Sequence, residues 1–304
     1  MIKILIVANY NKGRFSPFIE DQAAALKHSG VSVAFFRVEG KGALGYLKNR
    51  KKLLAAIRRE KPDLIHAHYG LSGLLANLQR QKPVVTTYHG SDINYKNIFR
   101  LSKIAMWLSE FSIFVSQKNL EKSKQKTKCD LIPCGVDFEV FAPVEKTLAR
   151  QEMGLDLTKK YVLFSSSFEN AVKNPVLARR AVELLPDVTL LELSGYTREN
   201  VAMLMNAVDA VLMTSFSEGS PQFIKEAMAC NCPIISVDVG DVREVTKNVN
   251  NCFIVDYNEN EIADKIKEIF AKNERTNGRE KINHLDNKLI AKRLIEVYDS
   301  IVKK

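Results

Sequence analysis

Residues 210–237 read AVLMTSFSEGSPQFIKEAMACNCPIISV, and this stretch decides the fold class. Its two apolar runs, Ala210–Thr214 and Pro233–Val237, have the length and composition of buried strands. Between them, a loop of small and polar residues leads into a segment with helical periodicity that begins near Pro221. A strand, a helix and a second buried strand in succession form one unit of a parallel α/β sheet.

The same alternation extends over the whole chain, with helical segments of about 10–15 residues between most of the strands. Strictly alternating strands and helices favour doubly wound parallel sheets. Two series of strands are expected: residues 2–8, 31–36, 63–67, 84–87, 112–115 and 129–132, and then residues 161–165, 188–193, 210–214, 233–237 and 252–255.

The two series are separated by residues 133–143, PCGVDFEVFAP, where Pro and Gly interrupt regular structure. A chain of 304 residues also suits two domains of roughly 150 residues each. We therefore predict one Rossmann-like domain over residues 1–143 and a second over residues 144–285, with a cleft between them. Residues 286–304 are expected to form a final helix that can pack back on the first domain.

The composition is that of a globular protein, with 46% apolar and 26% charged residues. No run approaches the ~18 apolar residues of a membrane-spanning helix, and the apolar run at the N-terminus is too short for a secretion signal. We therefore expect a cytoplasmic protein. Its five cysteines form no C-x-x-C pair, which argues against a disulfide framework or a zinc ribbon and predicts structural thiols.

Charge is distributed unevenly along the chain. Residues 1–143 contain 23 Lys and Arg against 11 Asp and Glu, a net +12, whereas residues 144–304 contain 22 against 24, a net −2. Residues 45–59 and 99–108 both resemble amphipathic basic helices, which can dock peripherally on an anionic membrane surface. The same charges could instead serve solubility alone. No nucleic-acid reader motif accompanies them, so we expect no nucleic-acid partner.

The turn after the first strand, Asn9–Phe15, argues against two common classes of nucleotide-binding protein. It contains a single glycine, whereas a dinucleotide site needs G-x-G-x-x-G there, and the chain has no Walker A sequence. This disfavours an NAD-dependent dehydrogenase and a P-loop NTPase. Ligands of open α/β sheets nevertheless bind at the carboxyl ends of the strands, so the loops at those ends are the candidates.

Four such loops carry polar side chains: residues 66–73 (HAHYGLSG), 88–92 (YHGSD), 165–175 (SSSFENAVKNP) and 215–229 (SFSEGSPQFIKEAMA). In the last, the free N–H groups of a helix that starts at Gly219-Ser-Pro221 favour a phosphate. Glu226 lies about two turns into that helix, where a carboxylate can accept ribose hydroxyl groups, and Glu218 would face the cleft. Alternatively, both carboxylates are only charges near a helix start.

Together these loops resemble those of the retaining GT-B glycosyltransferases of family 4, and the resemblance covers nearly the whole chain. Its most specific part is the segment from Glu218 to Glu226. The other matching segments are DLIHAHYGLSG at residues 63–73, HGSD at 89–92, IPCGVD at 132–137 and GDVRE at 240–244.

The resemblance implies a GT-B fold and the transfer of a sugar, with retention of configuration, from a nucleotide-diphospho-sugar. The acceptor would be a glycan or a lipid-linked glycan of cell-envelope polysaccharide synthesis. The donor would bind mainly to the second domain and the acceptor mainly to the first. No cofactor and no metal ion are implied, in agreement with a sequence that has no D-x-D clamp and no metal-ligand spacing.

Individual roles follow from the positions that match the family. Lys173 would bind the donor diphosphate, Glu226 the ribose, and Glu218 the donor sugar near the reacting carbon. His89 would lie where sugar and acceptor meet, so that the catalytic candidates are His89, Lys173 and Glu218. The other donor-binding candidates are Gly219, Ser220, Pro221 and Gln222, and those for the acceptor or the cleft are Gly13, Arg14, His68 and Asp92.

Three departures from the family pattern affect the expected donor site. The Arg that usually precedes the phosphate-binding Lys is missing, and Arg14 or Arg180 could replace it. The usual Gly-Phe-Gly after the first Glu is Gly219-Ser-Pro221, which alters the pocket for the donor sugar. Residues 193–197 lead straight into a helix, where the family commonly has another strand.

Two other functions remain open, and so do the roles of four histidines. A non-hydrolysing sugar-nucleotide epimerase would use the same fold without an acceptor, and a catalytically inactive subunit would only bind the sugar nucleotide. His66 and His68 also fit buried strand residues whose rings are hydrogen-bonded within the protein. His28 and His284 resemble surface residues.

Overall fold

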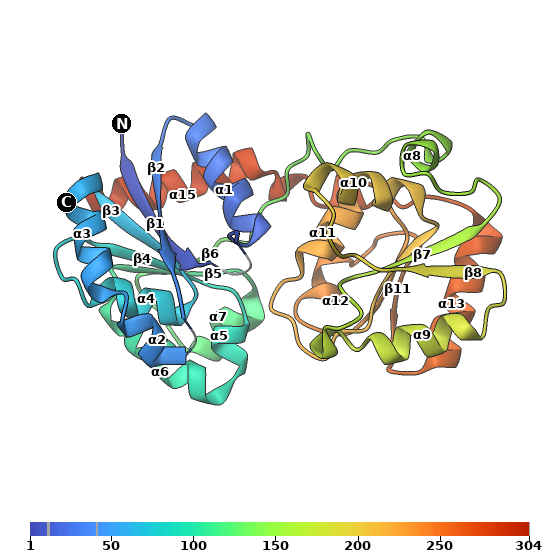
Figure 1. Ribbon diagram of the computed structural model, residues 1–304, viewed down its shortest axis with the longest axis horizontal. Coiled ribbons are helices and arrows are strands. Elements are labelled where there is room, and N and C mark those ends of the chain that lie inside the picture. The colour runs from blue at the N-terminus through green and yellow to red at the C-terminus, as the bar shows by residue number, and fades with distance from the viewer. Residues whose placement is uncertain (11–12, 41, 304) are drawn as a thin grey trace. The chain divides into compact units, whose positions relative to one another are not determined.

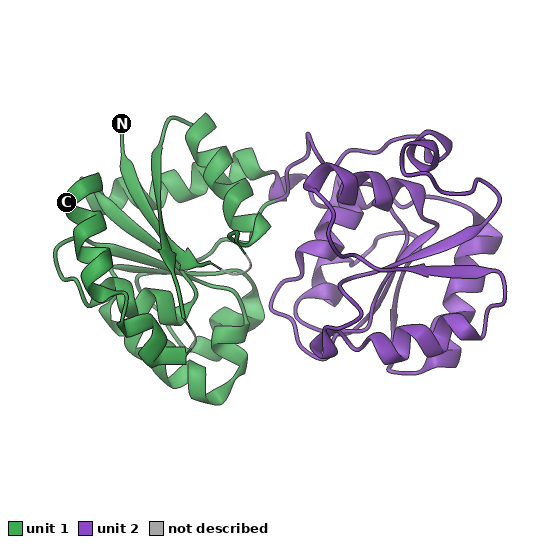
Figure 2. Ribbon diagram, viewed as in Figure 1, with its two compact units in different colours: residues 1–135, 287–304 green, residues 136–286 purple. Residues whose placement is uncertain are grey.

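The computed structural model describes residues 1–10, 13–40 and 42–303. These residues form two compact units (Figure 2). Unit 1 comprises residues 1–135 and 287–304, and unit 2 comprises residues 136–286. Each unit contains one sheet in which every described strand pairing is parallel (Figure 1). The two doubly wound α/β domains predicted from the sequence are therefore confirmed.

The sheet of unit 1 has the strand order β2-β1-β3-β4-β5-β6. Its strands are β1 (Lys3–Asn9), β2 (Ser32–Val38), β3 (Leu64–His68), β4 (Val84–Tyr88), β5 (Phe111–Phe114) and β6 (Cys129–Leu131). Its helices are α1 (Pro17–His28), α2 (Gly42–Leu47), α3 (Arg50–Glu60), α4 (Gly70–Asn77), α5 (Ser91–Asn94), α6 (Lys96–Leu108), α7 (Gln117–Ser123) and α15 (Asn287–Val302).

Unit 1 has a core on each face of its sheet, because successive residues of a strand point to opposite sides. Ile4 and Ile6 of β1 pack in the core that α1 and α15 cover. Leu5 and Val7 pack in the core that α3 and α4 cover. This burial on both faces explains why the strand reads as a continuous apolar run.

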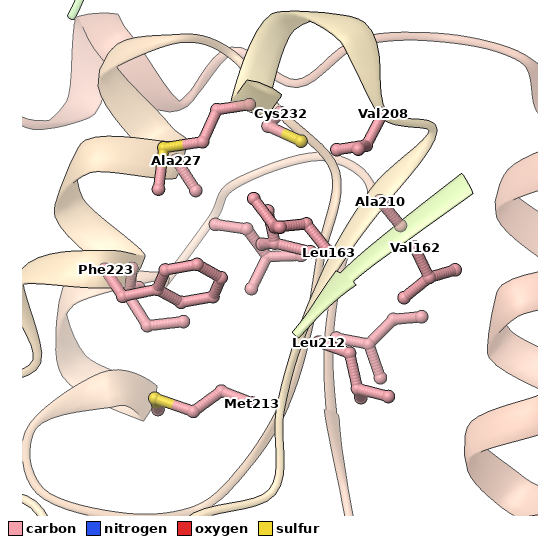
Figure 3. Close-up of a cluster of buried hydrophobic side chains, with 14 of the residues drawn as sticks. Val162, Leu163, Val208, Ala210, Leu212, Met213, Phe223, Ala227 and Cys232 are labelled. Carbon is pink, nitrogen blue, oxygen red and sulfur yellow. The ribbon is translucent and has the colours of Figure 1, made fainter. Parts of the chain in front are cut away.

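The sheet of unit 2 has the order β11-β10-β9-β7-β8. Its strands are β7 (Lys160–Phe164), β8 (Val188–Leu191), β9 (Ala210–Met213), β10 (Ile234–Val237) and β11 (Cys252–Val255). Its α-helices are α8 (Lys146–Glu152), α9 (Pro175–Glu183), α10 (Arg198–Ala207), α11 (Gln222–Ala229), α12 (Val242–Val245), α13 (Glu259–Lys272) and α14 (Gly278–Lys281). Figure 3 shows how Phe223 and Ala227 of α11 pack on Leu163 of the sheet.

The boundary between the units differs from the predicted one. Unit 2 begins at Val136 rather than after residue 143, because the Pro- and Gly-rich segment packs with unit 2. The backbone N–H of Val136 donates to Leu285 O at 2.8 Å, and the side chain of Phe141 is fully buried in the core of unit 2. Arg279 also donates to the carbonyl oxygens of Phe138 and Phe141.

A second correction concerns the basic segment 45–59, which forms two helices instead of one. The break lies at Asn49, whose side chain is buried. Its Nδ2 group donates to Glu39 O at 2.8 Å and to Gly45 O at 3.0 Å. The bond to Gly45 O satisfies a carbonyl group of α2, and the bond to Glu39 O ties the turn to the residue after β2, so the chain turns at Asn49 before α3 begins.

The final helix, α15, belongs to unit 1 although it follows unit 2 in the sequence (Figures 1 and 2). Ile290 and Leu294 pack in the same core as α1. The Tyr298 hydroxyl lies 2.6 Å from His66 Nδ1 of β3, and Arg293 donates to Asp130 and to Leu131 O. One core of unit 1 is therefore completed by α15, which packs on a face of the sheet.

We predict that Leu294→Ala lowers the free energy of unfolding of unit 1 by about 3 kcal/mol, because Leu294 is 1% exposed and its removal leaves a cavity. Leu289→Ala is the matched control, since Leu289 lies on the same helix and is 44% exposed. Hydrogen exchange of β1 and β3 peptides measures the difference. Equal loss of protection in the two variants would contradict a core role for α15.

Candidate functional site

The sheet of unit 2 has its topological switch point between β7 and β9. The chain runs from β7 to β8 on one side and then returns to β9 on the other side. In such sheets, ligands bind at the carboxyl ends of the strands that flank the switch point. The loops at these ends are residues 165–174 after β7 and residues 214–221 after β9, which contain Lys173 and Glu218.

Lys173 and Glu218 are in direct contact. Lys173 Nζ lies 2.5 Å from Glu218 Oε1, and their side chains are 25% and 14% exposed. Thr214, the first residue after β9, fixes this geometry by donating through Oγ1 to Lys173 O and Asn174 O. The structure therefore brings two of the three predicted catalytic residues together at the switch point.

Gly240, in the loop after β10, allows that loop to pack against Glu218. Gly240 follows β10 and has φ +62°, a backbone conformation that L side chains rarely adopt. A Cβ atom there would lie 2.8 Å from Gly219 O and 3.3 Å from Glu218 Cβ. Only glycine leaves room for the loops after β9 and β10 to pack this closely. This packing explains why the GDVRE segment begins with glycine.

Glu226 is held by a residue that the sequence analysis missed. It is 5% exposed on α11, and its Oε1 atom lies 2.8 Å from Arg198 Nη1 at the start of α10. The Arg198 guanidinium in turn lies 4.6 Å from the centre of the Phe141 ring. Glu226 is therefore a buried, ion-paired carboxylate and not a solvated helix charge. The residue pattern carries no signal for this pair, because its members lie on different helices.

Three buried hydroxyl groups lie close in sequence to these residues. The Oγ atoms of Ser165, Ser215 and Ser220 have no hydrogen-bond partner within the described part of the chain. Ser165 follows β7, Ser215 lies in the loop after β9, and Ser220 lies just before α11. Buried polar groups usually have partners, so unsatisfied hydroxyls at strand ends are suited to hydrogen-bond a polar ligand.

Of the two candidates to replace the missing Arg, Arg180 is exposed on α9. Arg14 belongs to unit 1, where it lines a separate pocket. Residues 192–197 connect β8 to α10 without a further strand, as predicted. Lys173 lies beside Glu218 in unit 2.

In unit 1, three histidines cluster at the carboxyl ends of β3 and β4: His66 and His68 are residues of β3, and His89 follows β4. His66 is fully buried, with Nδ1 bonded to the Tyr298 hydroxyl and Nε2 bonded to Thr87 Oγ1 at 2.7 Å, which identifies it as a structural residue. His68 Nδ1 lies 3.0 Å from His89 Nε2, and His89 Nδ1 lies 3.6 Å from Cys134 Sγ. Burial lowers the pKa of His66 to about 3 and that of His68 well below its usual value, so both rings are neutral at pH 7.

Asp92 organises the turn that holds His89. Its carboxylate accepts hydrogen bonds from the backbone N–H groups of Gly70, His89 and Gly90 at 2.9–3.1 Å. The side chain is 2% exposed, and burial raises its pKa to about 6. Asp92 therefore joins the loops after β3 and β4.

A pocket of about 780 Å³ opens at these strand ends and is lined by Arg14 and Asp92, two of the four predicted acceptor residues. Gly13 and His68 do not line it. Tyr46 and Tyr69, which the sequence analysis did not single out, do line it. Tyr69 has φ +73°, unusual for a bulky residue, and its ring lies 4.6 Å from that of His89. Strain of this kind often marks a functional site.

The remaining predicted residues are at the surface or in the core. His28 and His284 are exposed, as expected. All five cysteines are free thiols, and Cys134, Cys230 and Cys232 are buried. Among residues 1–10, 13–40 and 42–303, no group of three or more His, Cys, Asp or Glu residues could hold a metal ion. Within the same ranges, no helix has both the length and the apolar character that crossing a membrane requires.

Two family models match the sequence. The model described as Glycosyltransferase Family 4 matches residues 14–140, and the model described as Glycosyl transferases group 1 matches residues 161–272. A protein of Bacillus subtilis strain 168 named teichuronic acid biosynthesis glycosyltransferase TuaC is 26% identical over 238 residues, which cover 66% of this chain and 61% of that protein. The chain spans about half to two thirds of the length of the curated relatives that it matches.

Solved structures share the fold of the chain. Sucrose-phosphate synthase from Thermosynechococcus elongatus has a TM-score of 0.84 and 19% sequence identity, with 100% of both chains covered. Alr3699/HepE from Anabaena, in complex with UDP and glucose, has a TM-score of 0.78 and 18% identity, covering 99% of this chain and 100% of that chain. Identities this low establish a common architecture only.

The raised pKa of Asp92 predicts a specific pH dependence. Between pH 4 and pH 6 the folded protein keeps the Asp92 proton and the unfolded chain releases it, so stability falls as the pH rises. Relative to Asp92→Asn, the free energy of unfolding of the wild type should fall by about 1 kcal/mol per pH unit in this range. Urea titrations at several pH values measure it, and parallel curves for the two proteins would contradict the prediction.

Proposed function

This chain belongs to glycosyltransferase family 4, and on that premise we propose that it transfers a sugar from a nucleotide-diphospho-sugar to a glycan or lipid-linked acceptor. The observation that carries the proposal is the contact between Lys173 and Glu218 at the switch point of unit 2. The buried carboxylate of Glu226 lies on the helix that follows the same loop. Cation, carboxylates and unsatisfied hydroxyls together suit a diphosphate that carries a ribose and a sugar.

Unit 2 is the proposed donor-binding unit. Lys173 would bind the diphosphate, and the loop of Gly219, Ser220, Pro221 and Gln222 would surround it with N–H and hydroxyl donors. Glu226, on the helix that follows this loop, would accept ribose hydroxyl groups. The structural neighbour HepE was solved in complexes with UDP and UDP-glucose, which supports a uridine nucleotide among the donors to test first.

The proposed mechanism follows from the charge that develops during the reaction. Breaking the anomeric C–O bond places positive charge on the sugar and negative charge on the leaving diphosphate. Lys173 and the N–H groups near Gly219 would stabilise that negative charge more strongly in the transition state than in the ground state. The cation and the N–H groups would make a metal ion unnecessary.

Retention of configuration is part of the proposal. Glu218 already holds Lys173, so we assign it to the donor sugar and not to a covalent nucleophile. Attack on the face from which the diphosphate departs then accounts for retention. His89 of unit 1 would lie where the donor sugar and the acceptor meet. Its backbone N–H donates a hydrogen bond to Asp92.

The proposed pathway is the synthesis of cell-envelope polysaccharide. This part is supported by the relative TuaC, whose name refers to teichuronic acid biosynthesis. The comparisons favour neither an epimerase nor an inactive sugar-nucleotide-binding subunit, since the curated relatives are named as glycosyltransferases.

We also propose that unit 1 docks on an anionic membrane. Trp107 of α6 is 82% exposed and Ile104 on the same helix is 46% exposed. Arg100 and Lys103 lie among them and are exposed as well. Exposed apolar side chains interleaved with cations are typical of helices that lie in a membrane interface.

The donor site predicts stabilisation by one class of nucleotide sugar. At 100 times its dissociation constant, a ligand adds about 2.7 kcal/mol to stability, which raises Tm by several degrees for a chain of this size. Thermal scans with UDP, GDP, ADP and dTDP sugars should show such a shift for one base. Glu226→Gln should abolish the shift, and Glu183→Gln, an exposed control on α9, should retain it. A panel without any shift would contradict the proposed donor site.

The membrane proposal predicts that Trp107→Ser weakens binding to vesicles rich in phosphatidylglycerol by about tenfold, because the indole no longer enters the interface. Cosedimentation measures the partition. Phe216→Ser is the control, since Phe216 is an aromatic residue of unit 2 that is 61% exposed. If the two substitutions weaken binding equally, unit 1 has no specific role in docking.

A further inference from the structure

Unit 1 contains a second hollow beside the pocket of about 780 Å³ that Arg14 and Asp92 line. It has a volume of about 420 Å³ and shares Arg14 and Phe15 with the larger pocket. Three aromatic rings contribute to its lining. The centres of the Tyr10 and Phe15 rings are 5.0 Å apart, and those of the Phe15 and Phe35 rings are 4.8 Å apart. The lining comes from the loop after β1, from α1 and from β2, which adjoin each other in Figure 1.

Three cations line this hollow, and they come from three different segments of the chain. Arg14 lies before α1, Lys27 lies in the last turn of α1, and Arg37 lies in the edge strand β2. The Arg37 guanidinium lies 4.5 Å from the centre of the Tyr10 ring, and Lys27 Nζ lies 5.9 Å from that of Phe35. The rings therefore hold two of the cations at the hollow.

These cations lack partners of opposite charge. Within the described residues, none of the three forms an ion pair with a carboxylate. The hollow is lined by a single acidic residue, Glu20. Among the described lining residues, three positive charges and one negative charge leave a local excess of two, and like charges held close together repel each other.

A pocket in unit 2 contains a cluster of charged residues whose role is structural. There, Asp209 pairs with both Lys146 and Arg150 and also accepts the N–H of Tyr161. Its cations are used within the protein. In unit 1, no carboxylate of the described residues pairs with Arg14, Lys27 or Arg37, which points to an anion from outside.

We propose that the hollow of Arg14, Lys27 and Arg37 binds a phosphate or diphosphate group of the acceptor. The inference rests on the proposed function, because it assigns the larger pocket to the acceptor sugar. Arg14 lines both pockets, so one guanidinium can contact the sugar and the phosphate attached to it. A guanidinium binds phosphate through two parallel N–H···O bonds, and a group with two charges matches the local excess.

Binding of pyrophosphate tests the hollow of unit 1. The donor site is filled beforehand, so that pyrophosphate does not bind there. Isothermal titration is carried out on the full chain saturated with the nucleoside diphosphate, among UDP, GDP, ADP and dTDP, that raises its Tm. Arg37→Ala and Lys27→Ala should each raise the Kd for pyrophosphate about tenfold. Arg58→Ala removes an exposed arginine of α3 outside both pockets and should change Kd less than twofold.

An equal loss of affinity in Arg37→Ala and Arg58→Ala would overturn the proposal, because it would show an effect of net charge alone. An unchanged Kd in both Arg37→Ala and Lys27→Ala would also overturn it. Failure of UDP, GDP, ADP and dTDP alike to bind would contradict the donor site instead, and the pyrophosphate titrations of the wild type and the variants would still decide the site of unit 1.

Two further ligands identify the molecule that carries the phosphate. Glucose 1-phosphate represents a free sugar phosphate, and geranyl diphosphate represents a lipid-linked acceptor. If either ligand binds more tightly than pyrophosphate and Arg37→Ala removes this gain, the result supports the site. It also identifies the kind of molecule that carries the phosphate. If glucuronate binds more tightly than both, the site recognises a carboxylate and the assignment to phosphate is wrong.

Discussion

Parallel strand pairing is the constraint on which the rest of this structure depends. Because all strands of a sheet run in one direction, every loop that follows a strand emerges at the same edge. Lys173 and Glu218 are 45 residues apart in sequence, yet their loops meet because β7 and β9 are neighbours. His68 and His89 meet in unit 1 because β3 and β4 are neighbours. The chemistry of both units is therefore positioned by the sheets.

Buried polar groups then fix the loops that the sheets bring together. Thr214 binds the carbonyl groups of the Lys173 loop, and Asp92 binds the N–H groups of two loops in unit 1. Gly240 allows a third loop to approach Glu218. Thr214, Asp92 and Gly240 each fix the backbone of a loop. They thereby position the side chains that the same loops present to ligands.

The sequence predicted the fold well because buried parallel strands read as continuous apolar runs, and such runs have few other interpretations. It also predicted which loops carry Lys173, Glu218 and His89, since these follow strands. It did not predict the pairing of Glu226 with Arg198, which depends on how two helices pack. The boundary of unit 2 was missed for a similar reason: residues rich in Pro and Gly suggest a linker, but Phe141 enters the core.

The chain crosses between the two units twice, and the crossings are adjacent. Val136 and Asp286 form a β-bridge, and a Cβ atom on Gly135 would overlap the side chain of Asn287. Unit 2 is thus inserted into unit 1 as a continuous segment. During synthesis on the ribosome, all of unit 2 emerges before α15, so the first unit to be translated is the last to complete its core. A ribosome that stalls before residue 287 would leave part of the apolar face of β1 and β3 uncovered beside α1, open to capture by a chaperone.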